Sequence, residues 1–268
     1  MSEPILIERR GHVALLTLNR PDTRNALSGE AMFAAFEQTF AALNADLNVR
    51  VAILTGAGTA FCSGGNVAEM RERRGMFAGT PEQIAQAYRD GIQRIPRAFE
   101  ALQVPIIAAV NGPAIGAGND LACMCDLRIA SRQARFAESF VKVGIVPGDG
   151  GCWLLPRVVG YARAAEMALT GDAIDAEEAL RIGLVSRVVA PEALLDEALQ
   201  LAARIAANPP QVLRWTRQLL QQARTATLDE ALGSAGRLQG LAHHTNDHAE
   251  AVAAFFEKRA PRFQGAAT

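Results

Sequence analysis

Two apolar runs in the first half of the chain do not alternate polar with apolar residues. VAILT begins at Val51, and PIIAAV begins at Pro105. A strand with one face in water alternates, so strands without alternation must be covered on both faces. HVALLTLNR (12–20) and DLRIA (126–130) also indicate strands, and longer segments of helical periodicity separate these runs. This order predicts an α/β fold in which crossover helices cover the sheet.

The rest of the chain is predicted to be mostly helical. At residue 80, TPEQ offers a threonine cap, a proline in the first turn and a glutamine that completes a capping box. We expect this helix to continue to a break or kink at Pro96. From about Arg163 the strand signal fades, and glycine and proline punctuate helical segments. We therefore predict a core over residues 1–197 and a C-terminal helical region over residues 198–268.

Composition limits the partners and the location of the chain. The formal net charge is −1 and the arginines are scattered, so we expect no nucleic-acid partner. The chain lacks a run of eighteen apolar residues and the pattern of a signal peptide, so we expect no membrane association and a cytoplasmic location. The cysteines lack the paired spacing of a zinc site, and we interpret HHTNDH, with His244 and His248, as ordinary helix. We therefore expect no metal.

Two glycine-rich loops follow apolar strands and precede predicted helices. They are GTAFCSGGNVAEM (58–70) and NGPAIGAGNDLACMCD (111–126). Backbone N–H groups at such a helix start have no partner and lie at the positive end of the helix dipole, so they bind an anion or a developing oxyanion. Neither loop has the third glycine of a dinucleotide-binding motif. Ser63 lacks both the flanking pattern and the nearby histidine of a serine nucleophile.

These loops resemble those of the crotonase, or enoyl-CoA hydratase/isomerase, superfamily. RNAL (24–27), FVKVGIVPGDGG (140–151) and AFFEKR (254–259) extend the resemblance in the same order over nearly the whole chain. It implies a crotonase-like spiral core of repeated strand–strand–helix turns that binds acyl-CoA. It also implies a C-terminal α-helical region for assembly into a homotrimer or a dimer of trimers. Coenzyme A is part of an acyl-CoA thioester substrate, so no separate cofactor is implied.

The resemblance places the thioester oxygen of the substrate against the backbone N–H groups of Gly65 and Ala117, which would stabilise an enolate. It places Arg24 near the phosphates of coenzyme A. The substrate-binding positions that it implies are Arg24, Ala26, Ser63, Gly64, Gly65, Asn66, Val67, Ala117, Phe140, Phe255 and Lys258. Asn66 replaces the usual aspartate of the family, which keeps hydrogen bonding but removes a charge.

Phe255 and Lys258 belong to the terminal helix. Helical periodicity assigns its packing face to Ala249, Val252, Ala253 and Phe256. Phe255 and Lys258 lie away from that stripe. They match family positions that approach coenzyme A, often from a neighbouring subunit. An ordinary exposed helix face is the alternative interpretation.

The resemblance does not supply a complete acid–base pair. Family hydratases use two glutamates; Asp120 matches the first, and Phe140, which cannot transfer a proton, occupies the position of the second. Glu138 shares a face with Phe140 if the segment is extended, but we interpret it as solvated or salt-bridged. Asp149 comes one residue after the position at which family isomerases carry an aspartate. We take Asp149 as the second carboxylate, with a pKa raised if its pocket is dry.

These residues predict an enzyme that acts on acyl-CoA thioesters in the breakdown of fatty acids or related compounds. Enoyl-CoA hydratase is the first hypothesis, with Gly65, Ala117, Asp120 and Asp149 as its catalytic groups. A double-bond isomerase, which needs a single base, is the close alternative. A third hypothesis, which Phe140 favours, is an acyl-CoA-binding protein without catalytic activity.

Overall fold

The computed structural model describes residues 3–265. Its strands are β1 (Ile5–Arg10), β2 (Val13–Leu18), β3 (Val51–Gly56), β4 (Ile106–Val110), β5 (Ala114–Ile115), β6 (Leu127–Ser131), β7 (Arg135–Ala137), β8 (Ile174–Asp175) and β9 (Arg187–Val189). Its α-helices are α1 (Glu30–Ala45), α2 (Val67–Glu72), α3 (Pro81–Asp90), α4 (Arg94–Ala101), α5 (Ala117–Met124), α6 (Gly151–Val159), α7 (Tyr161–Thr170), α8 (Ala176–Arg181), α9 (Leu194–Ala206), α10 (Pro210–Gln222), α11 (Leu228–His243) and α12 (Asn246–Glu257). Short 3-10 helices are η1 (Pro21–Thr23), η2 (Gly75–Phe77), η3 (Ser139–Val143) and η4 (Pro191–Ala193).

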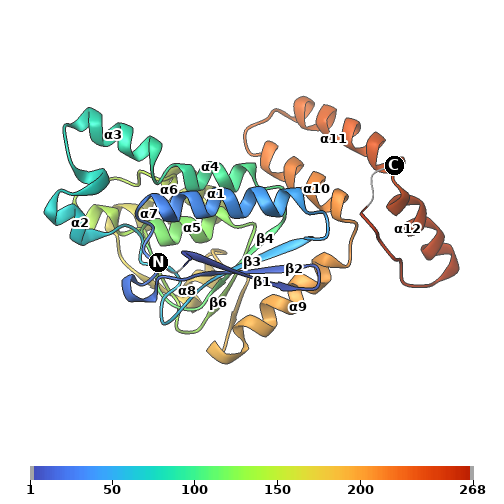
Figure 1. Ribbon diagram of the computed structural model, residues 1–268, viewed down its shortest axis with the longest axis horizontal. Coiled ribbons are helices and arrows are strands. Elements are labelled where there is room, and N and C mark those ends of the chain that lie inside the picture. The colour runs from blue at the N-terminus through green and yellow to red at the C-terminus, as the bar shows by residue number, and fades with distance from the viewer. Residues whose placement is uncertain (1–2, 266–268) are drawn as a thin grey trace.

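The four apolar runs form β2, β3, β4 and β6, which are neighbours in one sheet of order β1-β2-β3-β4-β6-β9. β1 pairs antiparallel with β2, and the other pairs are parallel. Leu54 of β3 belongs to the core under α1 and α4, whereas Ile53 belongs to the core under α9. Figure 1 shows helices on both sides of this sheet. The expectation that both faces are covered is therefore confirmed.

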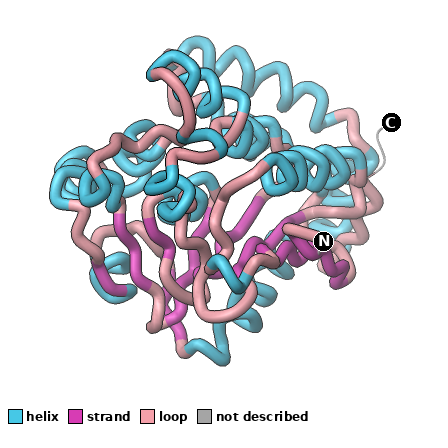
Figure 2. Tube along the Cα trace, turned by 60° about the vertical axis from the view of Figure 1, so that its left-hand side comes forward, coloured by secondary structure: helices cyan, strands magenta, loops and turns pink. Residues whose placement is uncertain are grey.

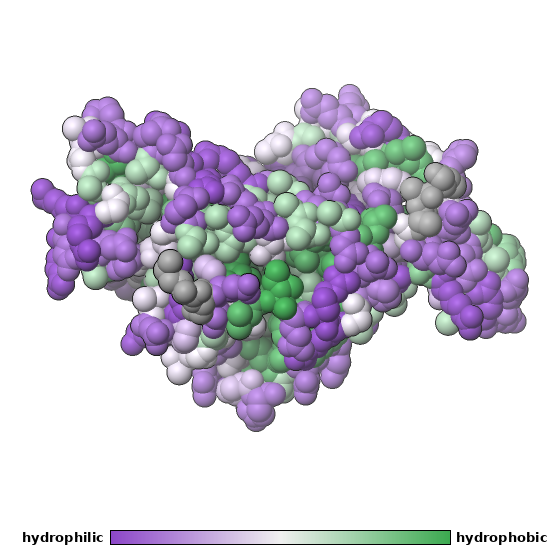
Figure 3. All heavy atoms as spheres, in the orientation of Figure 1, coloured by the Kyte–Doolittle hydropathy of each residue, from purple (hydrophilic) through white to green (hydrophobic). Residues whose placement is uncertain are grey.

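The two edge strands were not predicted. In β1 only Ile5 is buried, and β9 has three half-buried residues, so neither carries a strong hydrophobic pattern. Figure 3 shows an apolar patch over the region of β1, where Leu6 and Ile7 are exposed. Strands of this kind are recognised by their pairing partners rather than by their own sequence.

A second, smaller sheet of order β5-β7-β8 gives the fold its spiral form. The chain runs from a strand of the large sheet to a short strand of the small sheet and then into a helix, as in β4, β5, α5. An isolated parallel bridge between Cys62 and Ala114 adds the loop after β3 to the same layer. Figure 2 shows the strands enclosed by helices. The expected spiral of strand–strand–helix turns is confirmed.

The helix that begins at Thr80 ends earlier than expected. Its capping box with Gln83 is present, but α3 stops at Asp90, and Gly91 takes an irregular conformation (φ −110°, ψ −112°). The next helix, α4, places Pro96 in its first turn, where a missing N–H removes no helical hydrogen bond. The predicted break at Pro96 is therefore wrong, because this proline lies in the first turn of a helix instead of ending one.

The boundary predicted after residue 197 falls inside α9. One face of this helix, with Leu194, Ala198 and Ala202, packs on the large sheet and belongs to the core. Small side chains allow close approach of the helix to the strands. The division into a core and a C-terminal assembly region stays a prediction, but α9 itself lies with the core.

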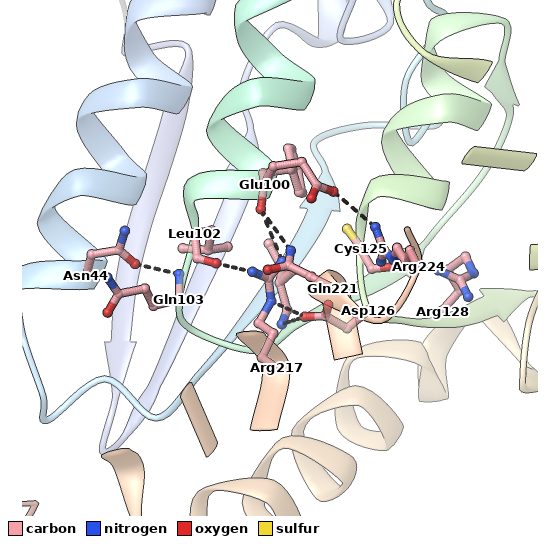
Figure 4. A network of polar contacts seen from close by, with 12 residues as sticks. Asn44, Glu100, Leu102, Gln103, Cys125, Asp126, Arg128, Arg217, Gln221 and Arg224 are labelled. Carbon is pink, nitrogen blue, oxygen red and sulfur yellow. Dashed lines mark hydrogen bonds and ion pairs between the residues drawn. The ribbon is translucent and has the colours of Figure 1, made fainter. Parts of the chain in front are cut away.

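A buried ion pair attaches α10 to the core (Figure 4). Arg217 Nε donates to Asp126 Oδ2 (2.7 Å), and the same oxygen accepts from Ile106 N (2.8 Å). The Arg217 guanidinium also donates to the carbonyl groups of Leu102 and Phe99 at the end of α4. Asp126 ends the second glycine-loop motif, so this aspartate holds the end of α5 beside the start of β4. The position of α5 in turn fixes the residues of the loop before it.

The terminal helix packs differently from its predicted stripe. In α12 the buried residues are Asp247 and Ala254, whereas Val252 is 42% exposed and Phe256 is 78% exposed. Asp247 accepts hydrogen bonds from the backbone of Gln264 and the following residue, which turns this polar side inward. Figure 1 shows α11 and α12 at the end of the molecule, away from the sheet. The predicted packing face is therefore wrong for the single chain.

No helix within residues 3–265 is long and apolar enough to cross a membrane.

Candidate active site

The RNAL turn (24–27) is hydrogen-bonded to the first glycine loop. Ser63 N donates to Arg24 O (2.9 Å), and Ser63 Oγ donates to Thr23 O (3.0 Å). Leu27 N donates to Gly64 O (2.9 Å). Arg24 has a left-handed backbone conformation and is exposed to solvent. These bonds bring the predicted residues 24, 26, 63 and 64 into one unit.

Asn25 organises this unit, and sequence reasoning gave it no role. It is fully buried and left-handed (φ 59°). Its Nδ2 donates to the carbonyl group of Ala57, just before the first glycine loop, and to those of Ala60 and Phe61 within it. A buried asparagine with several backbone partners fixes loop geometry. The signal available in the sequence was a polar residue, Asn25, between an arginine and two apolar residues in RNAL.

The second loop packs directly on the first. Ile115 N donates to Cys62 O (3.0 Å). Gly64 has φ 82°, and a Cβ there would lie 3.2 Å from Ala117 N and 2.5 Å from Ile115 O. Only glycine allows this contact. The backbone of the first loop thus touches the N-terminus of α5.

The two predicted oxyanion donors lie in these touching loops. Ala117 is the first residue of α5, and Gly65 immediately follows the glycine that contacts it. Among residues 3–265, neither the Gly65 N–H nor the Ala117 N–H donates to a protein acceptor. Free N–H groups at a helix start, close to a second free N–H, can bind one oxygen that gains negative charge. The assignment to a thioester oxygen stays a prediction.

The other residues predicted in these loops have defined positions. Asn66 caps α2, and its side chain accepts from Ala68 N and Glu69 N, so hydrogen bonding is kept as expected. Val67 follows it and is 56% exposed. The Phe140 ring lies over Gly116, 3.7 Å from where a Cβ would stand. Phe140 therefore borders the oxyanion region.

Three buried carboxyl groups gather next to these loops. Asp120 comes from α5, Glu138 from the end of β7, and Asp149 from the glycine turn before α6; each is at most 2% exposed. Glu138 and Asp120 meet at Gly151, where a Cβ would overlap Glu138 Oε1 and lie 2.5 Å from Asp120 Oδ1. Asp149, two residues before Gly151, is close enough to shift the pKa of Asp120. Glycine is required here because any side chain would displace the carboxyl groups. The structure thus unites the predicted Asp120 and Asp149.

The interpretation of Glu138 as solvated or salt-bridged is wrong. Its side chain is buried, and no lysine or arginine within the described residues forms an ion pair with it. Instead Asn119 Nδ2 donates to Glu138 Oε2 (2.9 Å). The short helix η3, which begins at Ser139, turns the chain, so Glu138 and Phe140 do not alternate as they would along a strand.

These carboxyl groups must share protons. Within residues 3–265, no N–H or hydroxyl group donates to either oxygen of Asp120 or Asp149, and the two carboxyl groups are close enough for each to shift the pKa of the other. Burial raises the pKa of Asp120 well above its usual range, and the charges of Asp149 and Glu138 raise it further. Burial also raises the pKa of Asp149, and that of Glu138 to about 7. Of the three carboxyl groups, Asp120 is therefore the one that retains its proton most readily.

An open cavity of about 610 Å³ lies between α2, α3 and the segment before the Asp149 turn. Its lining residues are Val67, Met70, Arg71, Arg73, Phe77, Gly79, Ile84, Tyr88, Val143 and Ile145. The Tyr88 ring packs against Gly148, where a Cβ would lie 2.6 Å from Tyr88 Cε1, and Gly148 precedes Asp149. Tyr88 is not among the site residues predicted from the sequence. Its role in the cavity wall depends on how α3 folds over the glycine turn.

Two predicted residues do not join the site within one chain. Phe255 and Lys258 lie at α12, and Figure 1 shows α12 and α2 at opposite ends of the long axis.

In the same region His243 Nδ1 lies 3.0 Å from His248 Nε2. Within the described part of the chain, no group of three or more His, Cys, Asp or Glu side chains is arranged to hold a metal ion.

Comparison with known proteins agrees with this geometry. A model of the family described as enoyl-CoA hydratase/isomerase matches residues 8–266. The chain is 40% identical over 264 residues to (E)-benzylidenesuccinyl-CoA hydratase of Thauera aromatica, covering 98% of this chain and 100% of that protein. It is 38% identical to 1,2-epoxyphenylacetyl-CoA isomerase of Escherichia coli, covering 99% and 100%. A crystal structure of enoyl-CoA hydratase from Bacillus anthracis is similar with a TM-score of 0.90 at 34% identity, covering 98% and 100%.

Proposed function

Because the chain belongs to the enoyl-CoA hydratase/isomerase family, we propose that it adds water to the double bond of a 2-enoyl-CoA thioester. It is an enzyme of this family, so the hypothesis of a binding protein without activity is set aside. The observation that carries the proposal is the arrangement of two free N–H groups in touching loops beside a buried cluster of carboxyl groups, in which burial and neighbouring charges raise the pKa of Asp120. Hydration needs an oxyanion site, a base and an acid.

In the proposed reaction Asp149 acts as the base and Asp120 as the acid. Asp149 takes a proton from a water molecule while the water oxygen bonds to the β-carbon. The electron pair of the double bond moves to the thioester oxygen, where the N–H groups of Gly65 and Ala117 stabilise the enolate. Asp120 then donates its proton to the α-carbon. Because Asp120 and Asp149 are neighbours in one buried cluster, the proton on Asp149 then passes to Asp120 and resets the pair.

The cavity beside the Asp149 turn supports an assignment for the acyl chain. Its wall includes Met70, Phe77 and Tyr88, and apolar walls suit a hydrocarbon acyl group. We propose that Arg24, which is exposed next to the first loop, binds coenzyme A phosphates by charge-assisted hydrogen bonds. Coenzyme A enters as part of the substrate, and the proposal requires no separate cofactor. A cytoplasmic location belongs to the same proposal.

Isomerisation of a double bond is the second candidate. Phe140 borders the oxyanion region at the position where family hydratases carry a glutamate, and a phenyl ring holds no water or proton. A single carboxylate suffices for isomerisation, because it can remove a proton at one carbon and return it at another. Asp149, which is buried and has a raised pKa, meets that requirement.

Substitution of Asp149 by asparagine tests the proposal. We expect hydration of crotonyl-CoA, followed as loss of the conjugated-thioester absorbance, to slow by about 10²-fold or more, because the water loses its base. A 3-enoyl-CoA assay with the wild-type chain, in which absorbance is gained, measures isomerisation. Isomerisation without hydration would support the second candidate. Unchanged hydration in Asp149→Asn would remove Asp149 from the mechanism.

The expected homotrimer or dimer of trimers is also part of the proposal. Apolar side chains of α11 and α12 are exposed in the single chain, among them Leu232 (60%), Phe255 (78%) and Phe256 (78%). Exposed apolar groups on neighbouring helices support burial against another copy. Light scattering of the purified chain should give the mass of three or six copies. A mass equal to one chain would contradict assembly and the placement of Phe255 beside a neighbouring site.

A further inference from the structure

Glu138 is a buried carboxyl group that the proposed reaction does not use directly. It follows β7 at the start of η3 and is 1% exposed. Asn119 Nδ2 holds its Oε2, whereas its Oε1 has no N–H or hydroxyl donor within residues 3–265. Oε1 instead faces the point at Gly151 where the Asp120 oxygens lie. One carboxyl oxygen of Glu138 is thus held by Asn119, and the other faces Asp120.

A second cavity, of about 200 Å³, reaches Glu138 from the side of α6 and α7. Its lining residues are Glu138, Gly151, Cys152, Leu155, Pro156, Tyr161, Ala164, Ala165, Ala168 and Leu169. None of them lines the 610 Å³ cavity. Tyr161 and Leu169 are 81% and 77% exposed, so the outer wall of this cavity is at the surface. Glu138 therefore lies between Asp120 on one side and, on the other, a separate cavity whose outer wall is at the protein surface.

The groups that face Glu138 are mainly acidic or neutral. Asp120 and Cys123 come from α5, Asp149 from the turn before α6, Cys152 from α6 and Tyr161 from α7. Burial raises the pKa of Cys123 to about 12, so this thiol carries no charge at neutral pH. The charge that matters next to Asp120 is consequently that of the other carboxyl groups.

We infer that Glu138 is a positioning residue of the proposed hydration: its carboxylate, fixed by Asn119, keeps the catalytic proton on Asp120. A negative charge on Glu138 disfavours a second negative charge on Asp120, and a carboxylate accepts a hydrogen bond from a protonated carboxyl group. Asn119 stabilises the charged form of Glu138. The second cavity lets Glu138 exchange its own proton without passing through the substrate cavity. This inference rests on the proposed function for the role of the Asp120 proton.

The test is the pH profile of Glu138→Gln. Glutamine has the same shape and still accepts from Asn119, but it never carries charge. Burial raises the pKa of Glu138 to about 7, so wild type and variant both have a neutral side chain well below that pH and differ above it. We expect kcat of the variant to match wild type near about pH 5.5 and to fall about tenfold below it near about pH 9, with KM unchanged.

Two further variants make this result specific. Asn119→Ala removes the donor to Glu138, and we expect a fall of the same sign at high pH. Glu197→Gln on α9, which changes a carboxylate in an ion pair with Arg187 far from the cluster, is the matched control and should leave the profile unchanged. A loss of kcat in Glu138→Gln that is equal at every pH would overturn the inference, because a structural defect does not follow the charge of Glu138.

A measurement without substrate separates this inference from the proposed function. The folded chain binds the Glu138 proton more tightly than the unfolded chain, so wild-type stability to urea should fall as pH rises from about 4.5 through about 7. The loss of stability with rising pH should be smaller in Glu138→Gln than in wild type. If Glu138 raises the pKa of Asp120, the loss in wild type should also extend to higher pH. If no enoyl-CoA is turned over, the proposed function fails, and these stability curves decide the inference. Identical pH dependence in the two chains would overturn it.

Discussion

Replacing Asp120 with asparagine is expected to lower kcat for crotonyl-CoA hydration by about 10³-fold, with a small effect on KM. Asp120 holds the proton that the α-carbon receives, and asparagine cannot donate one. Because burial and two neighbouring carboxylates keep Asp120 neutral at neutral pH, a neutral amide of the same shape suits the folded state. The measurement is kcat and KM at several pH values, with circular dichroism and thermal unfolding to show that the fold is intact.

Asp172→Asn provides the control for the Asp120 substitution. Asp172 is exposed and pairs with Lys142 at 2.9 Å, with side-chain exposures of 73% and 53%, so its contribution to stability is small. The same change of aspartate to asparagine there should leave kcat within about twofold of wild type, because surface pairs contribute little. Retention of most of the activity in Asp120→Asn would rule out Asp120 as the acid and leave Asp149 as a single proton carrier.

Replacing Ala117 with proline is expected to lower kcat/KM by about 10²–10³-fold, which is the usual cost of one lost oxyanion donor. Proline removes the N–H and leaves the other loop donor, that of Gly65, in place. Ala117 is the first residue of α5, where proline is well tolerated because its N–H bonds no helical carbonyl. The preceding Gly116 has φ 55° and ψ −122°, a conformation open to glycine before proline as well.

Ala117→Gly is the matched control for the donor. It keeps the N–H and removes only a methyl group, so we expect a change of kcat/KM of about threefold or less. Thermal unfolding of both variants separates a loss of the donor from a loss of α5. Equal activity of Ala117→Pro and wild type would show that the Ala117 N–H does not hold the thioester oxygen, and the proposed site would then have to be revised.

The substitutions of Asp120 and Ala117 act on different parts of one site. The oxyanion donors come from backbone, so they tolerate changes of side chain, whereas the proton chemistry depends on side chains that contact each other around Gly151. Groups in contact are not expected to act additively. Asp120→Asn combined with Glu138→Gln should therefore lose little more at high pH than Asp120→Asn alone.

The sequence predicted the fold from local patterns. Continuous apolar runs gave β2, β3, β4 and β6 with both faces covered, and the threonine cap at residue 80 began α3 where expected. The edge strands, the helix break at Gly91 and the packing side of α12 were missed or wrong. Each of these depends on contacts with distant parts of the chain, which local periodicity does not contain.

The site divides in the same way. By itself the sequence determined the two glycine loops, the matching positions of Gly65, Ala117 and Asp120, and the absence of the second hydratase glutamate at Phe140. Only the tertiary structure decided that Glu138 is buried and that it meets Asp120 and Asp149 around a glycine. The physical reason is that loop donors are backbone groups set by nearby residues. The charge of a carboxyl group is set by burial and by neighbours that the fold brings from far along the chain.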